Sequence, residues 1–189
     1  MTSPCAALQL IDTYYADNQP AKAILLAHSR EVAGLAGEIA ERVGRQTSVD
    51  LAFVEEAALL HDIGMLETDV PKLFCYGRAP YIAHGVIGAT LLRREGLPRH
   101  ARVCERHIGV GLSIKDITDQ QLPLPHRDMR PQTLEEIIVT YADLFFSKTR
   151  KGRRSVKKVR SALSRRGRYK VAIFDAWHQR FGLPEPDGD

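Results

Sequence analysis

The chain has 189 residues, of which 44% are hydrophobic and 26% charged, as in ordinary globular proteins with a full core. No apolar run approaches the roughly 18 residues that cross a bilayer, and the chain does not start with a basic region followed by an apolar stretch, so neither a membrane span nor a secretory signal is expected. Its three cysteines are odd in number and widely separated, which indicates reduced thiols and a cytoplasmic location.

The net charge of +4 is distributed unevenly along the chain. Residues 147–174 contain twelve Lys and Arg and no acidic residue, so the remainder carries 15 basic and 23 acidic residues. The basic segment 148–170 is most simply a solvated helix face, because it has few aromatic side chains on which bases could stack. Nucleic-acid binding is the less favoured interpretation, and steering of an anionic nucleotide is intermediate between the two.

Nearly every periodic segment of the chain has helical spacing, and no strand is expected. Pro20 can open a helix in which His28 shares a face with apolar residues at spacings of three and four, so His28 should point to the core. A second helix is expected from about residue 49 to residue 61. His61 lies on its apolar face with Leu51, Val54 and Ala58.

The middle of the chain predicts two shorter helices between loops. A loop over 65–83 precedes a helix that begins near His84 and ends at Gly96. The next helix opens at Pro98 and places His107 on its inner face with His100 and Cys104. Residues 109–132 contain three prolines and little periodicity, which is typical of a long loop that acts as a lid.

The last third begins with a capping-box pattern at residues 133–136. The helix that follows is apolar almost all round, so it should be central and buried, with Asp143 in its middle. The basic segment contains a helix with an apolar stripe, and a final amphipathic helix carries Phe174, Trp177 and Phe181. We expect one all-α domain over residues 1–189, with its core at about 20–148 and the basic segment and C-terminal helix at 149–182.

The sequence Ala-Ala-Leu-Leu-His-Asp-Ile-Gly at residues 57–64 carries the main chemical signal. A buried carboxylate without a partner costs several kcal/mol or more, and a metal ion removes that penalty because imidazole and carboxylate are its natural ligands. One inward-facing His alone is more often a hydrogen-bonded core residue. Inward-facing titratable residues on five helices are improbable by coincidence, so a metal centre is favoured. Its candidate ligands are His28, His61, Asp62, His84, His107 and Asp143.

This order of residues resembles the HD-domain metal-dependent phosphohydrolase superfamily. His28, the His61-Asp62 pair and Asp143 follow the family's order, and residues 61–64 match its HDIG variant letter for letter. The resemblance covers about residues 23–148. It implies an all-α bundle of five or more core helices, followed here by C-terminal helices.

The resemblance also implies a ligand set. Residues matching His28, His61, Asp62 and Asp143 bind one metal ion in the family. Members with two ions add two histidines in the interval where His84 and His107 lie, so Asp62 would bridge the ions and act as a catalytic residue. His100 is expected to be structural, and Cys104 is expected to be a small apolar filler.

Two divalent ions roughly 3.5–4 Å apart suit phosphate-ester hydrolysis. Ligands without a thiolate favour Mn, Fe, Co or Ni over structural Zn, with Mg as a further candidate. Lys148 is a candidate catalytic residue, although a cation near a helix end is an equal explanation. His126 could protonate a leaving oxygen from a closing lid, although a surface His is the commoner case. The candidate cations for binding the substrate are Arg78, Lys115, Arg127, Arg130 and Lys148.

The expected function is metal-dependent hydrolysis of a nucleotide or another small phosphomonoester or phosphodiester. Two alternatives remain open: a di-iron oxygenase with the same six ligands, and a non-catalytic metal- or nucleotide-binding regulatory module. The expected partner is a phosphorylated small molecule, and no membrane partner is expected. The final helix could pack on its own domain or on a second copy in a homodimer.

Overall fold

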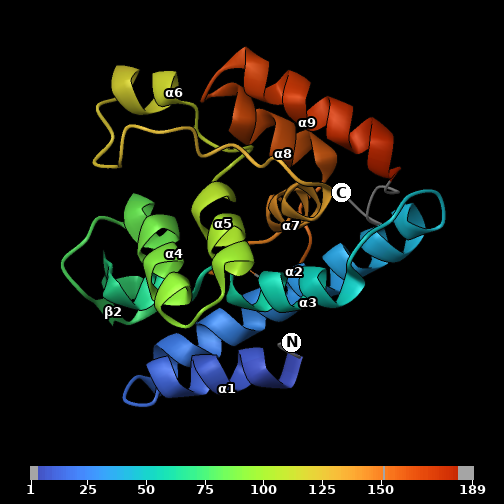
Figure 1. Ribbon diagram of the computed structural model, residues 1–189. Helices are drawn as coiled ribbons and strands as arrows, with labels where there is room; N and C mark the ends of the chain where they lie inside the picture. The colour runs from blue at the N-terminus through green and yellow to red at the C-terminus, as the bar shows by residue number, and fades with distance from the viewer. Residues whose placement is uncertain (1–3, 151, 183–189) are drawn as a thin grey trace.

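The computed structural model describes residues 4–150 and 152–182 and is built almost entirely of helices (Figure 1). The expectation of an all-α fold is therefore confirmed. The helices of the described residues are α1 (Pro4–Tyr14), α2 (Gln19–Gly44), α3 (Leu51–Leu60), α4 (His84–Arg94), α5 (Pro98–Arg106), α6 (Ile114–Asp119), α7 (Leu134–Asp143), α8 (Val156–Ser164) and α9 (Arg168–Phe181).

The long helix α2 begins where the sequence predicts it. The side chain of Asn18 caps it by accepting a hydrogen bond of 3.1 Å from the backbone N–H of Ala21, and Pro20 lies in its first turn. α1, which sequence periodicity left unassigned, runs beneath α2 in Figure 1 and packs against α3. These helices form the base on which the rest of the bundle is assembled.

Two apolar clusters lie along α2. Leu25 belongs to a cluster made by α1, α3, α4 and α5, whereas Val32 belongs to one made by α3, α7, α8 and α9. His28 lies between these two residues on α2 and is 3% exposed. The core therefore has a polar junction at His28, and the other histidines and aspartates of the predicted site converge at this junction.

Three expectations about local structure are wrong. The segment 65–83, expected to be a loop, contains two strands paired antiparallel, β1 (Asp69–Val70) and β2 (Cys75–Tyr76). Three 3₁₀ turns lie within residues 63–83: η1 (Ile63–Glu67), η2 (Pro71–Leu73) and η3 (Tyr81–Ala83). Two-residue strands are too short to show a period. The segment 109–132 includes α6, which Ser113 opens with a capping box. α7 ends at Asp143 instead of continuing past it.

The C-terminal helices belong to the same core. The Tyr141 ring of α7 stacks on the Phe174 ring at 5.5 Å and meets the Phe181 ring edge-on at 5.0 Å. All three side chains are buried. The last helix therefore packs on its own domain. Within the described residues, no helix combines the length and apolarity that crossing a bilayer requires.

Candidate metal centre

Three histidines of the site are fixed by the same local hydrogen bond. The Nδ1 atom of each lies close to the carbonyl oxygen of the residue three positions earlier: 2.7 Å for His61 and Ala58, and 2.7 Å for His107 and Cys104. The Nδ1 atom of His84 lies 2.5 Å from the carbonyl oxygen of Tyr81. Because a carbonyl oxygen only accepts, Nδ1 donates, and Nε2 is the nitrogen that faces the other residues of the site. All three Nε2 atoms are thus prepared as ligands.

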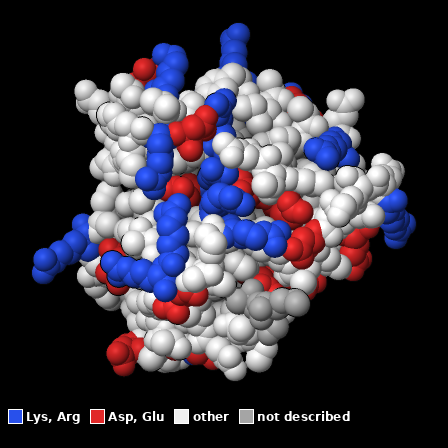
Figure 2. Space-filling view, viewed as in Figure 1, with Lys and Arg blue, Asp and Glu red and all other residues white. Residues whose placement is uncertain are grey.

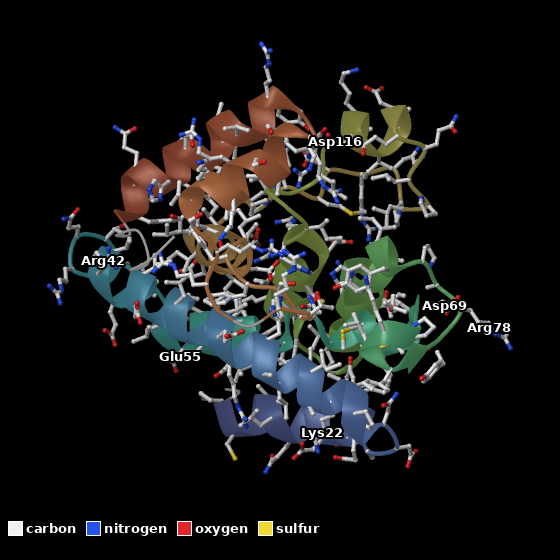
Figure 3. All side chains as sticks on the ribbon, turned by 180° about the vertical axis from the view of Figure 1, so that it is seen from behind. Lys22, Arg42, Glu55, Asp69, Arg78 and Asp116 are labelled. Atoms are coloured by element: carbon white, nitrogen blue, oxygen red, sulfur yellow. The ribbon has the colours of Figure 1, made fainter. Side chains whose placement is uncertain are left out.

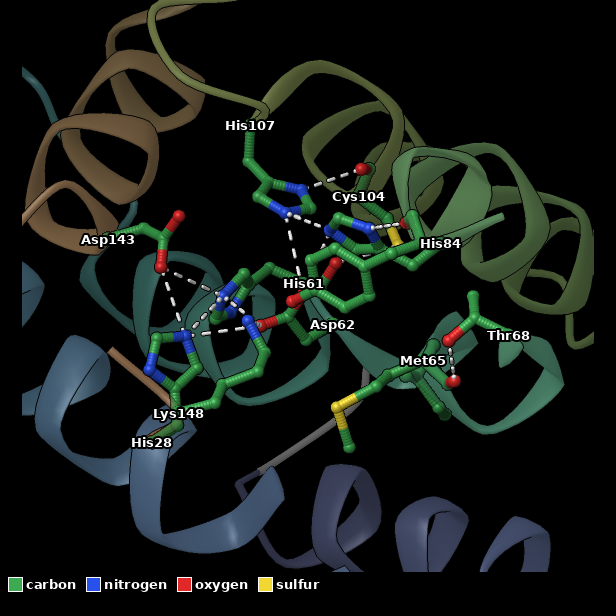
Figure 4. A network of polar contacts seen from close by, with 12 residues as sticks. His28, His61, Asp62, Met65, Thr68, His84, Cys104, His107, Asp143 and Lys148 are labelled. Carbon is green, nitrogen blue, oxygen red and sulfur yellow. Dashed lines mark hydrogen bonds and ion pairs between the residues drawn. The ribbon is translucent and has the colours of Figure 1, made fainter. Parts of the chain in front are cut away.

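Asp62 stands between two groups of these ligands (Figure 4). Its Oδ2 atom lies 3.1 Å from Nε2 of His28 and 3.0 Å from Nε2 of His61. Its Oδ1 atom lies 3.2 Å from Nε2 of His84 and 3.5 Å from Nε2 of His107. Two sets of candidate ligands therefore share one carboxylate, a four-residue set and a three-residue set: His28, His61, Asp62 and Asp143, and Asp62, His84 and His107.

Asp143 completes the first set from the C-terminal end of α7. Its Oδ1 atom lies 3.0 Å from Nε2 of His28 and 3.5 Å from Nε2 of His61. Because α7 ends at this residue, its side chain reaches the junction between the two apolar clusters. The structure thus brings together the six residues that the sequence singled out as metal ligands.

The residues of the second set fit a cation. The Nε2 atoms of His84 and His107 are 3.0 Å apart, yet both Nδ1 atoms carry the proton, so two lone pairs face each other. Burial lowers the pKa of His107, which disfavours sharing an additional proton. Both oxygens of Asp62 are buried: Oδ1 faces the Nε2 atoms of His84 and His107, and Oδ2 is paired with the Lys148 ammonium. A divalent ion would satisfy this arrangement of donors.

Electrostatic coupling in the centre is strong. Burial would raise the pKa of Asp62, but the neighbouring His61 and Lys148 charges outweigh it and hold this pKa well below its usual range. Burial would lower the pKa of His61, but the carboxylates of Asp62 and Asp143 raise it to about 10. Without a metal, cationic side chains neutralise these acids.

Lys148 lies inside the centre. Its Nζ atom forms an ion pair with Oδ2 of Asp62, and its side chain is only 11% exposed. The same ammonium lies 5.7 Å from the centre of the Tyr81 ring. Burial would lower the pKa of Lys148, but the Asp62 carboxylate outweighs burial and raises it. The residue lies beyond the end of α7, so it is not a cation of the last helical turn.

A cavity of about 620 Å³ opens onto this centre, which is within the usual range for sites of small ligands. His28, His84, His107 and Asp143 line its inner part. Its basic lining residues are Lys72, Lys148, Arg154, Arg166 and Lys170. Among the described residues that line it, Asp143 is the one carboxylate. The cavity is therefore suited to an anionic ligand.

Several predicted substrate-binding residues do not line this cavity. Arg78 is exposed and points outward from the loop after β2 (Figure 3), and His126 is exposed in the loop after α6. Lys115, whose side chain is 83% exposed, pairs at 2.8 Å with Asp119.

Two further predicted substrate-binding cations form ion pairs with carboxylates outside the cavity lining. Arg127 forms an ion pair with Glu105, and Arg130 forms one with Asp128. Figure 2 shows basic and acidic side chains interleaved on the face that α5 occupies in Figure 1. The structure thus leaves Lys148 as the predicted substrate-binding cation that reaches the cavity.

Sequence reasoning missed the residues that support the HD pair. The Tyr15 hydroxyl donates to the carbonyl of Ile63 at 3.0 Å and accepts from the N–H of Leu66 at 3.1 Å, so it fixes the turn after Asp62. The Cys104 thiol donates to the carbonyl of His61 at 2.9 Å. Both are buried, and neither has a local motif that signals such a contact.

The spacing of Lys170 and Phe174 is a sequence signal for part of the basic cavity lining. Lys170 precedes Phe174 by four residues, so both lie on one face of α9, and both are buried. His100, expected to be structural, lies outside the ligand cluster with Nε2 3.1 Å from Oε2 of the buried Glu56.

Comparisons with known proteins find relatives that match part of this chain. A curated tRNA (cytidine(56)-2'-O)-methyltransferase of Thermoplasma volcanium is 36% identical over 111 residues, which are 58% of this chain and 29% of that protein. An uncharacterised protein of Methanocaldococcus jannaschii is 37% identical over 121 residues, which are 63% of this chain and 64% of that protein. The chain therefore spans less than two thirds of these relatives.

Among solved structures, the HD domain of the Listeria monocytogenes phosphodiesterase PgpH shares the fold. It aligns with a TM-score of 0.51 at 18% identity, over 80% of this chain and 88% of that one. The family model described as the HD domain matches residues 25–146, which include the His61-Asp62 pair and all the other candidate ligands. The chain belongs to the HD-domain family.

Proposed function

We propose that this protein is a metal-dependent phosphohydrolase that acts on a nucleotide or another small phosphoester. The observation that carries this proposal is the pair of ligand sets that share Asp62 at the inner end of a basic cavity. Family membership supports the same reaction class, and the structural neighbour PgpH is named as a phosphodiesterase.

The six ligands would hold two divalent ions, of Mn, Fe, Co, Ni or Mg. Such ions would supply a water of lowered pKa and positive charge close to the phosphoryl oxygens. Asp62 would orient both ligand sets. The Lys148 ammonium would bind a phosphoryl oxygen or hold the proton needed by the leaving oxygen, because it already lies against Asp62 and lines the cavity.

The methyltransferase name of two relatives does not lead us to propose methyl transfer. The second, from Picrophilus torridus, is 34% identical over 114 residues, which are 60% of this chain but 30% of that protein. Most of each methyltransferase therefore lies outside the match. The residues gathered here instead fit a divalent metal ion.

Metal-dependent phosphate release tests the proposal. Protein stripped of metal and reloaded with Mn²⁺ should hydrolyse a member of a panel of nucleoside monophosphates, cyclic nucleotides and bis(p-nitrophenyl) phosphate. Asp62→Ala should lower the rate more than about 1,000-fold, because it removes the shared ligand. His126→Ala is the matched control, since His126 is exposed and does not line the cavity.

A wild-type protein that is inactive on the whole panel with every candidate metal would overturn the proposal. Oxygen consumption by the iron-loaded protein would instead support the di-iron alternative. Ligand binding without turnover of any kind would support a regulatory module.

A further inference from the structure

The C-terminal helices provide a wall of the cavity that lies outside the region matched by the family model. That match ends at residue 146, whereas Arg154, Arg166 and Lys170 all line the cavity. The apolar part of the same wall comes from α8, through Val159, Ala162 and Leu163. An apolar surface with cations around it suits a ligand that has an uncharged body and a charged group.

The guanidinium groups of this wall are available to a ligand. Within residues 4–150 and 152–182, neither Arg154 nor Arg166 forms an ion pair with a carboxylate. Arg160, on the same basic segment, lies 3.3 Å from Asp175 and does not line the cavity. Arg154 and Arg166 thus combine a place in the cavity lining with the absence of a carboxylate partner among the described residues.

Lys170 is held in place by its own partners. Its side chain is 4% exposed, with Nζ 3.3 Å from Oδ2 of Asp116 and 3.2 Å from the carbonyl oxygen of Gly111. Asp116 is itself fixed, because it accepts hydrogen bonds from the N–H and hydroxyl of Ser113 and from the Tyr169 hydroxyl. A buried ammonium with this support is a preorganised cation.

The positive charges of this wall are not balanced. Burial lowers the pKa of Lys170, and the charge of Arg166 lowers it further, whereas Asp116 raises it. Lys170 is therefore attracted by the Asp116 carboxylate and repelled by the Arg166 guanidinium. An anion from the ligand would relieve this repulsion, and charge-assisted hydrogen bonds to it would be strong in a partly enclosed site.

We propose that Arg154, Arg166 and Lys170 form a second anion subsite, separate from the metal centre. The substrate then carries a phosphate in addition to the one that is hydrolysed, and its uncharged body lies against the α8 wall. This inference rests on the proposed function, since it names the class of substrate for the same cavity. Lys148 remains the cation of the reacting phosphate, because it pairs with Asp62.

A binding measurement tests the subsite without turnover. Adenosine 3',5'-bisphosphate is titrated calorimetrically into metal-free protein. The double variant Arg154→Gln/Arg166→Gln should bind about tenfold more weakly than wild type, the loss expected from one charge-assisted hydrogen bond. The control Lys157→Gln/Arg168→Gln removes the same charge from the same segment, at exposed residues outside the cavity lining. Equal weakening in both double variants would overturn the subsite, as would absence of binding to wild type.

A kinetic ratio separates the two proposals. In metal-loaded protein, we compare kcat/KM for adenosine 3',5'-bisphosphate with kcat/KM for adenosine 5'-monophosphate. The ratio should fall about tenfold in Arg154→Gln/Arg166→Gln and stay constant in the control. Activity with an unchanged ratio would overturn the subsite and leave the hydrolase standing. No activity on any phosphoester, together with the binding difference, would support the subsite and overturn the hydrolase.

Discussion

Asp62 is the residue on which the centre depends, because its two carboxylate oxygens face different pairs of histidines. Each of three histidines is oriented by a backbone carbonyl three residues earlier, so their geometry is set by the ends of helices. Helix ends leave carbonyls without intrahelical partners, which makes them natural places for such ligands. The chemistry of the site thus begins with local backbone geometry.

Lys148 gives a prediction at the same scale. Lys148→Met should lower kcat about 100-fold, because the ammonium would no longer bind or protonate the phosphate, while the metal content stays constant. Steady-state kinetics and metal analysis of the purified variant measure both effects. Lys157→Met, at an exposed position of α8, is the control. An unaltered kcat in Lys148→Met would show that Lys148 only neutralises Asp62 in the metal-free protein.

At the scale of elements, η1 and α4 approach each other through glycine. A Cβ added to Gly64 would lie 2.3 Å from the carbonyl oxygen of His84 and 2.3 Å from the backbone nitrogen of Gly88. The turn after Asp62 is therefore pressed directly against the helix that carries His84. This contact explains why glycine ends the HDIG motif in this chain.

Gly64→Ala should lower the free energy of unfolding by about 3 kcal/mol, because backbone atoms must move apart. The matched control is Gly34→Ala, in the middle of α2, where an added Cβ meets nothing within 4 Å. That control should stabilise the protein by up to about 1 kcal/mol, since alanine favours helix. Urea unfolding measures both, and equal effects of the two substitutions would contradict the close contact.

The contact between α6 and α9 gives a pH prediction. Burial would raise the pKa of Asp116, but hydrogen bonds from Tyr169 and Ser113 outweigh it and lower it to about 2. The carboxyl pKa is lower in the folded state than in the unfolded state, so ionised Asp116 stabilises the fold. This stabilisation is complete above about pH 4, near the unfolded pKa, and is lost as the pH falls through about 2, the folded pKa. Asp116→Asn should therefore lose less stability than wild type between those values.

Unfolding in urea at pH 6, 4 and 2.5 measures this dependence on pH. Asp119→Asn provides the control, because the Asp119 carboxylate is exposed and pairs with an exposed lysine. Parallel stability curves for wild type and Asp116→Asn would show that the Asp116 network does not couple to folding.

At the scale of the whole molecule, α8 and α9 are part of one core with α2, α3 and α7. Phe174 is completely buried and contacts the rings of Tyr141 and Phe145. Phe174→Ala should destabilise the protein by about 3–5 kcal/mol, as for a large side chain in a central core. Lys157→Ala is the exposed control. A loss below about 1 kcal/mol in thermal or urea unfolding would mean that α9 is only loosely attached.

The helices that carry the candidate ligands could be predicted because their apolar faces repeat over several turns, as around His28 in α2. α6 could not, because its six residues form less than two turns and its capping box lies within a proline-rich segment. The ligand order predicted which side chains converge near Asp62. The spacing of Lys170 and Phe174 places both on one face of α9, but the meeting of Lys170 with Arg154 in one cavity depends on how α8 and α9 dock, which no local pattern specifies.

The number of metal ions per chain tests the central claim most directly. Protein purified without oxygen and without added metal should hold about two ions per chain, and His84→Ala and His107→Ala should each hold about one, because each removes a ligand of the second set. His126→Ala should keep about two. A wild-type protein that retains no ion, even after reloading, would contradict a metal centre built on Asp62, and two ions in His84→Ala and His107→Ala would contradict the second ligand set.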